Sequence, residues 1–489
     1  MIWLLVAACA VAAIPAGLRW LRVAQREHYL PGEVYRFAHR WWWRTTWVNR
    51  GLDVVGLVAA VMTAVDIRFG FVVPVVAATG PIGLSIKGVT SPLAWTERLR
   101  RVAFLAGAFM VLAFGVGIGW DQPFVMVAVL YFFPGVIDLS LWILSPYERR
   151  KGHEWVVKAT DKLKTIDPDV VAITGSYGKT TTKSYVAHLL SASRRVVASP
   201  ASFNNRMGLA RAINENLTPG TEVFVAEMGT YGRGEIAELC DWIPPRVAAL
   251  VAIGPVHLER FGSLDAIARA KSEILDRAEV GVICVDYPEL AAIAAERKGS
   301  MQILEVSAQD GIVVDGEAIM PVPEGVFGAN LAVALGICKA LGADSGNIAG
   351  RVPDLPTAEH RQSIVESPRG FKIVDDTFNS NPDGARSALS TLTRIADGGK
   401  TAIITPGMVE LGSVQDEENR KFAADAADQV DYFVIVGQTN RRALEAGSAN
   451  RRASVTVVAS RDEAVSWVVS NLGPGDAVLY ENDLPDHYP

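Results

Sequence analysis

Long apolar runs dominate the first 150 residues, whereas later positions alternate between short apolar runs and amphipathic stretches. A helix needs about 20 residues to cross the hydrocarbon core of a bilayer. The apolar runs therefore predict an α-helical membrane region at 1–150 with about five spans. The predicted spans are 2–18, 51–65, 69–86, 102–119 and 123–144. The second and third are predicted to form a helical hairpin that turns at the sequence DIRF.

Arginine and lysine are concentrated in alternate loops of this region. Seven arginines lie in the loop 19–50, four basic residues lie in the loop 87–101, and three more follow the last span. Because basic residues favour the cytoplasmic side, the pattern predicts an outside N-terminus and a cytoplasmic location for everything after residue 150. We therefore expect a multi-pass protein of a bacterial-type inner membrane. A cleaved signal peptide at 1–18 is the alternative, but more spans follow and no clear cleavage site does.

The positions after 150 predict two α/β domains, at 151–345 and 346–489. Strand-like and helix-like blocks alternate in both, which indicates mostly parallel sheets flanked by helices. The second domain is predicted to be Rossmann-like, with strands near FKIVDDT, TAIITP, DYFVIVG and ASVTVVA. Within this organisation, catalytic and ligand-binding residues are expected where strands end and helices begin.

Bulk composition excludes several classes of function. The chain has 489 residues and a net charge of −6, and no basic face stands out beyond the membrane-flanking clusters, so we expect no nucleic-acid binding. The four cysteines are far apart and form no CxxC pair. This spacing argues against a zinc ribbon or a disulfide framework and fits a reducing compartment.

The stretch AITGSYGKTTTK (172–183) has the context of a phosphate-binding loop. A β-branched apolar run precedes it and a helical pattern follows, so backbone N–H groups and a helix N-terminus face an anion. Lys179 is expected to reach the β- and γ-phosphates, and the hydroxyl of Thr180 is expected to bind Mg²⁺. The standard motif has glycine five residues before Gly178, but Ile173 stands there and the first glycine is Gly175.

Five segments, in order, resemble the Mur ligases, and chiefly their D-alanyl-D-alanine-adding (MurF) branch, over about 165–480. They are TGSYGKTTT, SPASFNNRMGLA, VFVAEMGTYGRGEIAEL, HLERFGSLDAIARAKSEIL and IVDDTFNSNPDGARSAL. The resemblance implies a central P-loop ATPase domain, a Rossmann-like C-terminal domain, and an ATP-dependent ligase that joins an acid to an amine. It implies an acyl-phosphate intermediate, release of ADP, and a role in peptidoglycan precursor or related envelope peptide synthesis.

The resemblance also assigns roles to individual residues. It implies ATP binding by Gly175, Ser176, Gly178, Lys179, Thr180, Thr181, Asn330, Arg361 and Asp376. It implies two Mg²⁺ sites held by Thr180, Glu227, His257 and Lys271, the last carrying a carbamate. Lys179, His257 and Lys271 are then the catalytic residues, and Asn204, Asn205, Asn379 and Asn381 are expected to contact substrate. For the adjacent Asn204 and Asn205, a plain turn role is the alternative.

Some positions depart from the family pattern. Gly407 stands where an aspartate is expected, Asn419 stands for a histidine, and the chain ends in LYENDLPDHYP instead of a Gly-Ser-x-Gly-Met loop. These departures lie on the side of the amine substrate and the closing domain. They leave the ATP chemistry intact and put the second substrate in doubt.

The membrane region occupies the place of the domain with which soluble Mur ligases bind the UDP of their substrate. This substitution suggests a membrane-associated acceptor, such as a lipid-linked or peptide precursor, joined to an amino acid or dipeptide. A plain anchor for an enzyme of soluble substrates is the alternative. Three other interpretations stay open: a membrane-tethered polyglutamate-type ligase, a nucleotide-driven transporter, and a scaffold with a degenerate ligase fold.

Overall fold

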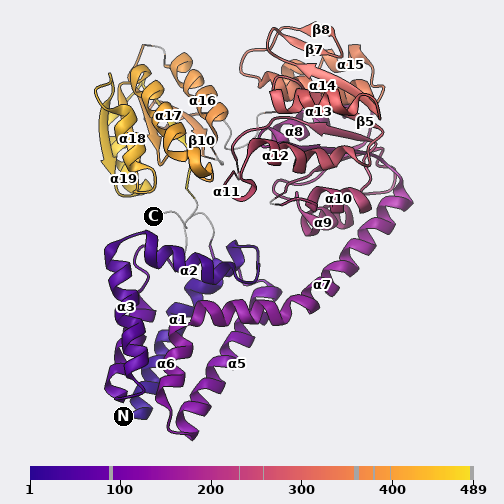
Figure 1. Cartoon of the computed structure of the whole chain (residues 1–489). Helices are drawn as coiled ribbons and strands as arrows, with labels where there is room; N and C mark the ends of the chain where they lie inside the picture. Colours follow the sequence, from indigo (N-terminus) through magenta and orange to yellow (C-terminus); the bar gives the residue numbers. More distant parts are fainter. Residues whose placement is uncertain are drawn as a thin grey trace. The chain divides into compact units, whose positions relative to one another are not determined.

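The computed structural model describes residues 1–86, 92–230, 232–256, 258–356, 363–377, 380–396 and 398–484. It divides into two compact units, which we call unit 1 (Met1–Lys151, with Leu484) and unit 2 (Gly152–Asp483). Unit 1 is helical, and unit 2 contains both α/β domains (Figure 1). Each unit is described by itself below.

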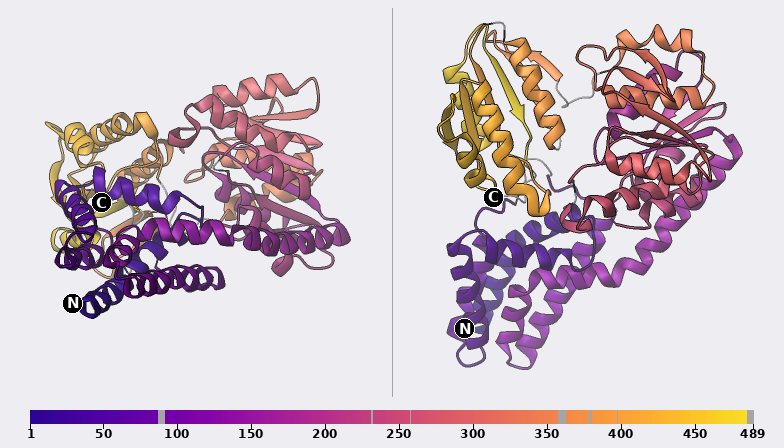
Figure 2. Two further views of the ribbon diagram at one scale, coloured as in Figure 1. Left: turned by 60° about the horizontal axis from the view of Figure 1, so that its bottom comes forward. Right: turned by 45° about the horizontal axis from the view of Figure 1, so that its top comes forward.

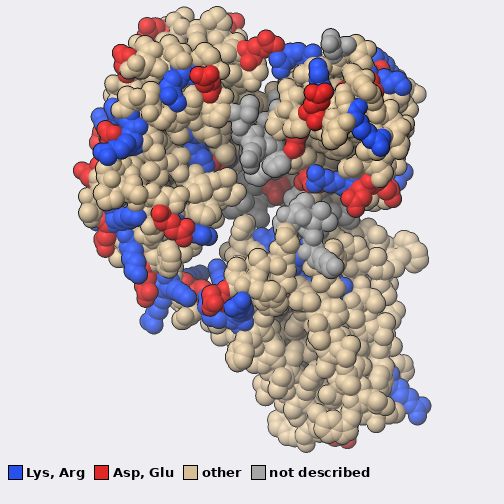
Figure 3. Space-filling model, turned by 180° about the vertical axis from the view of Figure 1, so that it is seen from behind, with Lys and Arg blue, Asp and Glu red and all other residues tan. Residues whose placement is uncertain are grey.

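Unit 1 consists of helices that pack side by side (Figure 2). Its elements are α1 (Ile2–Arg26), α2 (Glu33–Arg44), α3 (Trp47–Met62), the 3₁₀ helix η1 (Ile67–Phe71), α4 (Val72–Thr79), α5 (Glu97–Gly119), α6 (Pro123–Tyr131) and the start of α7 (Phe133–Ile166). Much of its surface carries few charged side chains, as Figure 3 shows from one side. The predicted all-helical architecture of this region is confirmed.

The predicted count of five spans is not confirmed. Among the described residues, two helices, α1 and α5, are long and apolar enough to cross a membrane. A third candidate is the pair α6 and α7, which is bent by 77° where a single span was predicted at 123–144. The predicted hairpin forms α3, with 16 residues, and the shorter apolar stretch Ile67–Thr79. At 1.5 Å per residue α3 is about 24 Å long, which is less than the roughly 30 Å of a hydrocarbon core.

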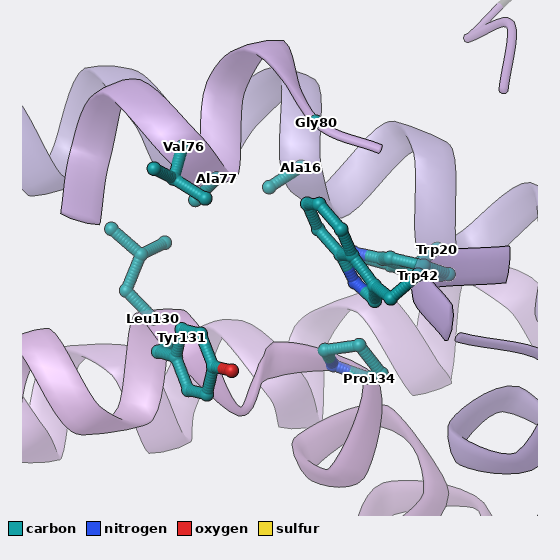
Figure 4. Close-up of a pocket in the computed structure, with 9 residues that line it drawn as sticks. All are labelled: Ala16, Trp20, Trp42, Val76, Ala77, Gly80, Leu130, Tyr131 and Pro134. Carbon is teal, nitrogen blue, oxygen red and sulfur yellow. The ribbon is translucent and has the colours of Figure 1, made fainter. Parts of the chain in front are cut away.

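A buried arginine explains how the chain turns after α4. Arg19 of α1 is 4% exposed, and its guanidinium donates hydrogen bonds to the carbonyls of Ala77, Ala78 and Leu84 at 3.1–3.2 Å. A helix end leaves carbonyls without intrahelical partners and carries partial negative charge, so a cation stabilises it. Beside this contact, Trp20, Trp42 and Tyr131 border a cavity of about 20 Å³ (Figure 4). That volume has room for about one water molecule and excludes a lipid chain.

The first α/β domain of unit 2 contains an eight-stranded sheet in the order β2-β3-β1-β4-β5-β6-β7-β8. The strands are β1 (Asp169–Thr174), β2 (Val196–Ala198), β3 (Val223–Glu227), β4 (Val247–Leu250), β5 (Val280–Cys284), β6 (Gln302–Ser307), β7 (Ile312–Val314) and β8 (Glu317–Met320). All pairs from β2 to β6 are parallel, and β7 and β8 are antiparallel. Parallel sheets are covered on both faces, which is why β1 and β3 are continuous apolar runs.

Helices cover the two faces of this sheet (Figure 1). Val171 and Ile173 of β1 pack on the side of α8 (Lys179–Leu190) and α14 (Gly328–Ala340). Val170 and Ala172 point to the other side. That side is covered by the end of α7, α9 (Arg206–Asn216), α10 (Glu235–Trp242), α12 (Leu264–Ser272) and α13 (Pro288–Arg297). The elements η2 (Glu273–Leu275), α11 (Leu258–Phe261), α15 (Ser345–Ala349) and η3 (Val352–Asp354) complete the domain.

The second α/β domain has a six-stranded sheet in the order β13-β12-β11-β14-β10-β9. The strands are β9 (Ser363–Glu366), β10 (Lys372–Asp376), β11 (Thr401–Thr405), β12 (Tyr432–Val436), β13 (Ser454–Val458) and β14 (Ala477–Glu481), with β9 antiparallel at one edge. The flanking helices are α16 (Pro382–Ile395), α17 (Gln415–Gln429), α18 (Arg441–Ser448) and α19 (Arg461–Asn471), with the 3₁₀ turn η4 (Gly412–Val414). The predicted α/β class is confirmed for both domains.

Candidate nucleotide and metal site

The loop 175–178 joins β1 directly to the N-terminus of α8. Its hydroxyl-bearing Ser176 is held against the next strand end, since its backbone N–H donates to Ala252 at 2.8 Å and its Oγ donates to Gly254 at 3.2 Å. Gly178 has φ +75°, and a Cβ there would collide with Asn330. Glycine is therefore required at 178 both by backbone conformation and by space. The loop presents the N–H groups of a helix N-terminus, which is the geometry of an anion site.

Glu227 is the centre of a buried polar cluster at the carboxyl end of β3. Its side chain is 3% exposed. One oxygen, Oε2, accepts hydrogen bonds from the Thr180 hydroxyl at 3.0 Å and from the Lys183 ammonium at 2.9 Å. The other oxygen, Oε1, accepts from the Asn204 amide at 3.2 Å. The predicted metal ligands Thr180 and Glu227 are thus in direct contact.

The electrostatics of this cluster keep Glu227 ionised. Burial by itself raises the pKa of a carboxyl. Here the Lys183 and Lys179 cations and the hydrogen bonds from Lys183 and Asn204 outweigh burial, so the pKa of Glu227 lies below its usual value. An ionised carboxylate and a hydroxyl are oxygen ligands of the kind that Mg²⁺ prefers, so these two residues fit the metal.

Lys271 on α12 is buried near the loop instead of lying in solvent. It is 3% exposed, and the part of the chain that the structure describes offers its ammonium no carboxylate. Burial, reinforced by the Lys179 cation, holds the pKa of Lys271 well below its ordinary value. A lowered pKa favours the neutral amine over the ammonium, and a neutral amine is a nucleophile.

The two predicted asparagines of the loop before α9 have different partners. Asn204 contacts Glu227, and its backbone carbonyl accepts from Gly229 at 2.7 Å. Asn205 instead begins α9, where its side chain accepts from the backbone N–H of Gly208 at 2.9 Å. Asn205 is therefore the N-cap of α9, and Asn204 contacts the predicted metal ligand Glu227.

Three predicted site residues, His257, Arg361 and Asn379, lie outside the described residues. Within the described ranges no group of three or more His, Cys, Asp and Glu side chains is arranged as a metal site. The Thr180–Glu227 pair alone therefore leaves most ligand positions of an ion to phosphate oxygens and water.

A cavity of about 220 Å³ lies within unit 2 next to the loop. Its lining includes Gly178, Thr181, Asn330, Asp376 and Asn381, all predicted to bind nucleotide or substrate. Asp376 ends β10 and is 8% exposed, and Asn381 begins α16 by accepting from Gly384 at 2.9 Å. The structure thus gathers these five residues around one cavity.

Sequence reasoning missed four residues of the site. Lys183 is one, although its position one helical turn after Lys179 places both lysines on the same face of α8. The others are aromatic side chains of the cavity, from Tyr177, Tyr287 and Phe327. Tyr177 stands inside the quoted loop, but no sequence pattern reveals that Tyr287 and Phe327 approach it.

Comparison with known families agrees with this geometry. The Mur ligase middle domain matches residues 173–325, and the Mur ligase, glutamate ligase domain matches residues 360–480. The chain belongs to the Mur ligase family. This Mur ligase is therefore an ATP-dependent ligase that forms a carbon–nitrogen bond.

Individual relatives place the similarity within the family. The chain is 29% identical over 364 residues to UDP-N-acetylmuramoyl-tripeptide–D-alanyl-D-alanine ligase of Mycobacterium leprae, covering 63% of this chain and 70% of the relative. Among solved structures it is similar to the MurF ligase of Thermotoga maritima in complex with ADP, with a TM-score of 0.57, 25% identity, and coverage of 68% and 80% of the two chains.

The fold is shared more widely. The bifunctional folylpolyglutamate synthase/dihydrofolate synthase of Yersinia pestis aligns with a TM-score of 0.52 at 18% identity over 68% of this chain and 90% of that chain. At that identity the likeness concerns the fold alone. The fold by itself therefore does not separate the two ligase classes, and the site residues have to.

Proposed function

We propose that this Mur ligase is a membrane-anchored, MurF-like amide ligase that forms ADP through an acyl phosphate and acts on an envelope peptide precursor. The observation that carries the proposal is the contact of Thr180 with the ionised Glu227 beside the loop that bears Lys179. Similarity to relatives named as D-alanyl-D-alanine ligases supports the reaction class.

The reaction has two steps with balanced atoms. The carboxylate of the acceptor attacks the γ-phosphorus of ATP, which forms the acyl phosphate and releases ADP. The amine of the second substrate then attacks the acyl carbon, which forms the amide, releases inorganic phosphate and gives up a proton. Because the transferred group is highly anionic, the protein contributes positioning and neutralisation of charge, and no protein nucleophile is needed.

The residues of the chain divide this work. The loop N–H groups and Lys179 bind the phosphates. Thr180 and Glu227 would hold Mg²⁺, which would supply neutralisation of the charge that develops on the phosphates. Asn330 and Asp376 line the cavity expected to take the nucleoside. Arg361, Asn379 and Asn381 are proposed to act from the second domain, on phosphate and on the substrate amine.

Lys271 is proposed to carry a carbamate and, with His257, to hold a second Mg²⁺. The amine of Lys271, in its neutral form, attacks CO₂, forming an N–C bond and releasing one proton, so a neutral amine becomes an anionic carbamate. The Lys179 cation disfavours a protonated Lys271 and favours an anionic carbamate, which is the physical support for the proposal.

The acceptor is proposed to be membrane-associated and lipid-linked. Support comes from the two, or with the bent pair three, helices of unit 1 that have the length and apolarity of membrane spans. On this proposal the catalytic unit lies on the cytoplasmic side of an inner membrane. The competing assignment is an anchor for a ligase of soluble substrates, including a polyglutamate-type ligase of the same fold.

The test is ATP turnover by the detergent-solubilised full chain beside Lys179→Ala, with a total lipid extract and a pool of amino acids and dipeptides. We expect Lys179-dependent ADP only when extract and amine are both present, and a product whose mass equals lipid plus amine minus water. Turnover on soluble acids alone would reject the lipid-linked acceptor. No Lys179-dependent ADP under any combination would reject the ligase and favour a degenerate scaffold.

A further inference from the structure

A second lysine on α8 already neutralises the carboxylate that is proposed to hold the metal. Lys183 is 5% exposed and Glu227 is 3% exposed, and their ion pair spans 2.9 Å. The Thr180 hydroxyl donates to the same carboxylate oxygen, and Asn204 donates to the other one. Both oxygens of Glu227 are therefore engaged by groups of the protein.

Lys183 opposes a metal ion at this position. A divalent cation that binds Oε2 of Glu227 shares that oxygen with the Lys183 ammonium, and repulsion between charges is strong where water is excluded. Lys179 adds a second positive charge close enough to lower the pKa of Glu227. With one carboxylate facing two ammonium groups, the site as the protein builds it is a poor site for a cation by itself.

A nucleotide changes this balance. The β- and γ-phosphates bring several negative charges to the loop that bears Lys179, and their oxygens are ligands for a metal. Lys183 also has another acceptor in reach, since its ammonium donates to the carbonyl of Pro200 at 3.4 Å. It keeps a hydrogen bond when a metal draws the Glu227 oxygen away.

We propose that Lys183 is a positioning residue that holds Glu227 before a nucleotide binds and makes metal binding depend on nucleotide, so that the metal enters with the phosphates and not before them. The inference rests on the proposed function, because it takes Glu227 as a metal ligand and the loop as a nucleotide site. It adds an order of binding and a residue that enforces the order.

Manganese is the probe, because free Mn²⁺ is counted directly by its paramagnetic resonance signal and no turnover is needed. The full chain in detergent is titrated with Mn²⁺ alone and with a non-hydrolysable ATP analogue. We expect the analogue to tighten Mn²⁺ binding on the order of 10-fold or more, within the roughly 5–150-fold range of coupling between sites. Coupling is reciprocal, so Mn²⁺ must tighten analogue binding by the same factor.

Variants separate the charge of Lys183 from its packing. Lys183→Met should tighten Mn²⁺ binding without nucleotide by about 10-fold and remove most of the coupling, whereas Lys183→Arg keeps the charge and should retain the coupling. Glu227→Gln should abolish the nucleotide-independent binding that Lys183→Met creates. The matched control is Lys339→Met, which removes an exposed lysine paired with Glu317 at 3.2 Å and should behave as wild type.

Three outcomes would each overturn one of the two proposals. Equal Mn²⁺ affinity of the wild type with and without the analogue overturns the inference, and this comparison stands even when Lys183→Met fails to fold. Unchanged coupling in a folded Lys183→Met also overturns it and leaves Lys183 a structural residue. Failure of the wild type to bind the analogue at all overturns the proposed function instead.

Discussion

The two sheets of unit 2 differ in the partners of a buried carboxyl group at the carboxyl ends of their strands. At the ends of β1 and β3, the cations of Lys179 and Lys183 face one carboxylate, that of Glu227. At the ends of β10, β11 and β14, the buried carboxyl of Glu481 is surrounded by neutral hydroxyl and amide groups. Two cations face one carboxylate at the first edge, whereas the hydrogen-bond donors to Glu481 at the second edge are neutral hydroxyls.

The second edge is satisfied by its own side chains. Glu481 is fully buried and accepts hydrogen bonds from Ser380 and Thr405. Asn419 bonds both the N–H and the carbonyl of Met408, at 2.7 and 2.9 Å. Asn482 donates to the carbonyl of Gly407 at 2.7 Å. The departures from the family pattern at 407, 419 and 481–482 thus belong to one closed network.

The contrast between the two edges indicates where a ligand binds. A fully satisfied polar network rigidifies a fold, whereas buried charge in excess costs free energy until something neutralises it. The surplus of positive charge at the first edge therefore favours an anionic ligand, in agreement with the proposed binding of a triphosphate there. The second edge has no such requirement, so this part of the chain holds its conformation without a ligand in the positions where it departs from the family.

The largest effect is expected from Glu227→Gln, which leaves Lys183 buried without its counter-charge. Breaking a buried ion pair on one side costs about 3–5 kcal/mol, and loss of the metal ligand should lower the rate of ADP formation about 10²–10³-fold. Hydrogen exchange of the β3 amides measures the first effect and single-turnover ADP formation measures the second. The double variant Glu227→Gln/Lys183→Met should recover stability but not activity. Recovery of both would mean that the first edge has no catalytic role.

The next prediction is that Lys271 is converted into a carbamate. The wild-type full chain, equilibrated with ¹³C-bicarbonate, should show one labelled carbamate that Lys271→Ala lacks. ADP formation by the wild type should rise with the bicarbonate concentration. The lowered pKa of Lys271 favours the neutral amine, which is the form that reacts with CO₂, so the carbamate should be lost as pH falls and protonation competes. Full activity in carbon-dioxide-free buffer, with no labelled carbamate, would contradict this.

Gly407→Asp restores the residue that the family pattern expects, and we expect it to be destabilising. Gly407 has φ +78°, and a Cβ there would collide with the Asn419 side chain. Strain and overpacking together should cost about 2–4 kcal/mol. The matched control is Gly475→Asp at φ +87°, where nothing lies within 4 Å of the added Cβ, and about 1 kcal/mol is expected.

Hydrogen exchange of the β11 and β14 amides measures both glycine variants in the full chain. Equal costs at 407 and 475 would show that the network around Asn419 yields easily. In that case the second edge would not be a rigid structure held by hydrogen bonds among its own polar groups.

The smallest effect is expected from Glu481→Gln. Burial raises the pKa of Glu481, although the hydrogen bonds from Ser380 and Thr405 oppose the shift. The folded state then binds the proton more tightly than the unfolded chain does, so the stability of this domain falls as pH rises from the ordinary glutamate pKa through the raised one.

Glutamine cannot ionise, so the variant should lose this pH dependence and be more stable than wild type above that window, with little change below it. Thermal unfolding of the two proteins from pH 4 to 8 checks the sign. A wild type that gains stability with rising pH relative to Glu481→Gln would mean that the carboxyl is ionised and paired after all.

Local sequence signals were sufficient to predict much of the first edge. The run before the loop predicted β1, the glycine pattern predicted the turn at Gly178, and the strand end predicted Glu227. These features depend on backbone propensity and on residues within about one turn, which a sequence displays directly. The count of five spans from the same signals is not confirmed, because an apolar run does not reveal that Arg19 contacts carbonyls near the end of α4 or that the chain bends between α6 and α7.

The sequence alone reveals the candidate nucleotide-binding groups at the ends of β1 and β3. Only the tertiary structure decided how they pair. The Lys183–Glu227 contact joins residues 44 positions apart, and the Ser380–Glu481 contact joins residues 101 positions apart. Parallel strands bring such distant strand ends to one edge, and the pairing there depends on burial and register, which no local pattern encodes.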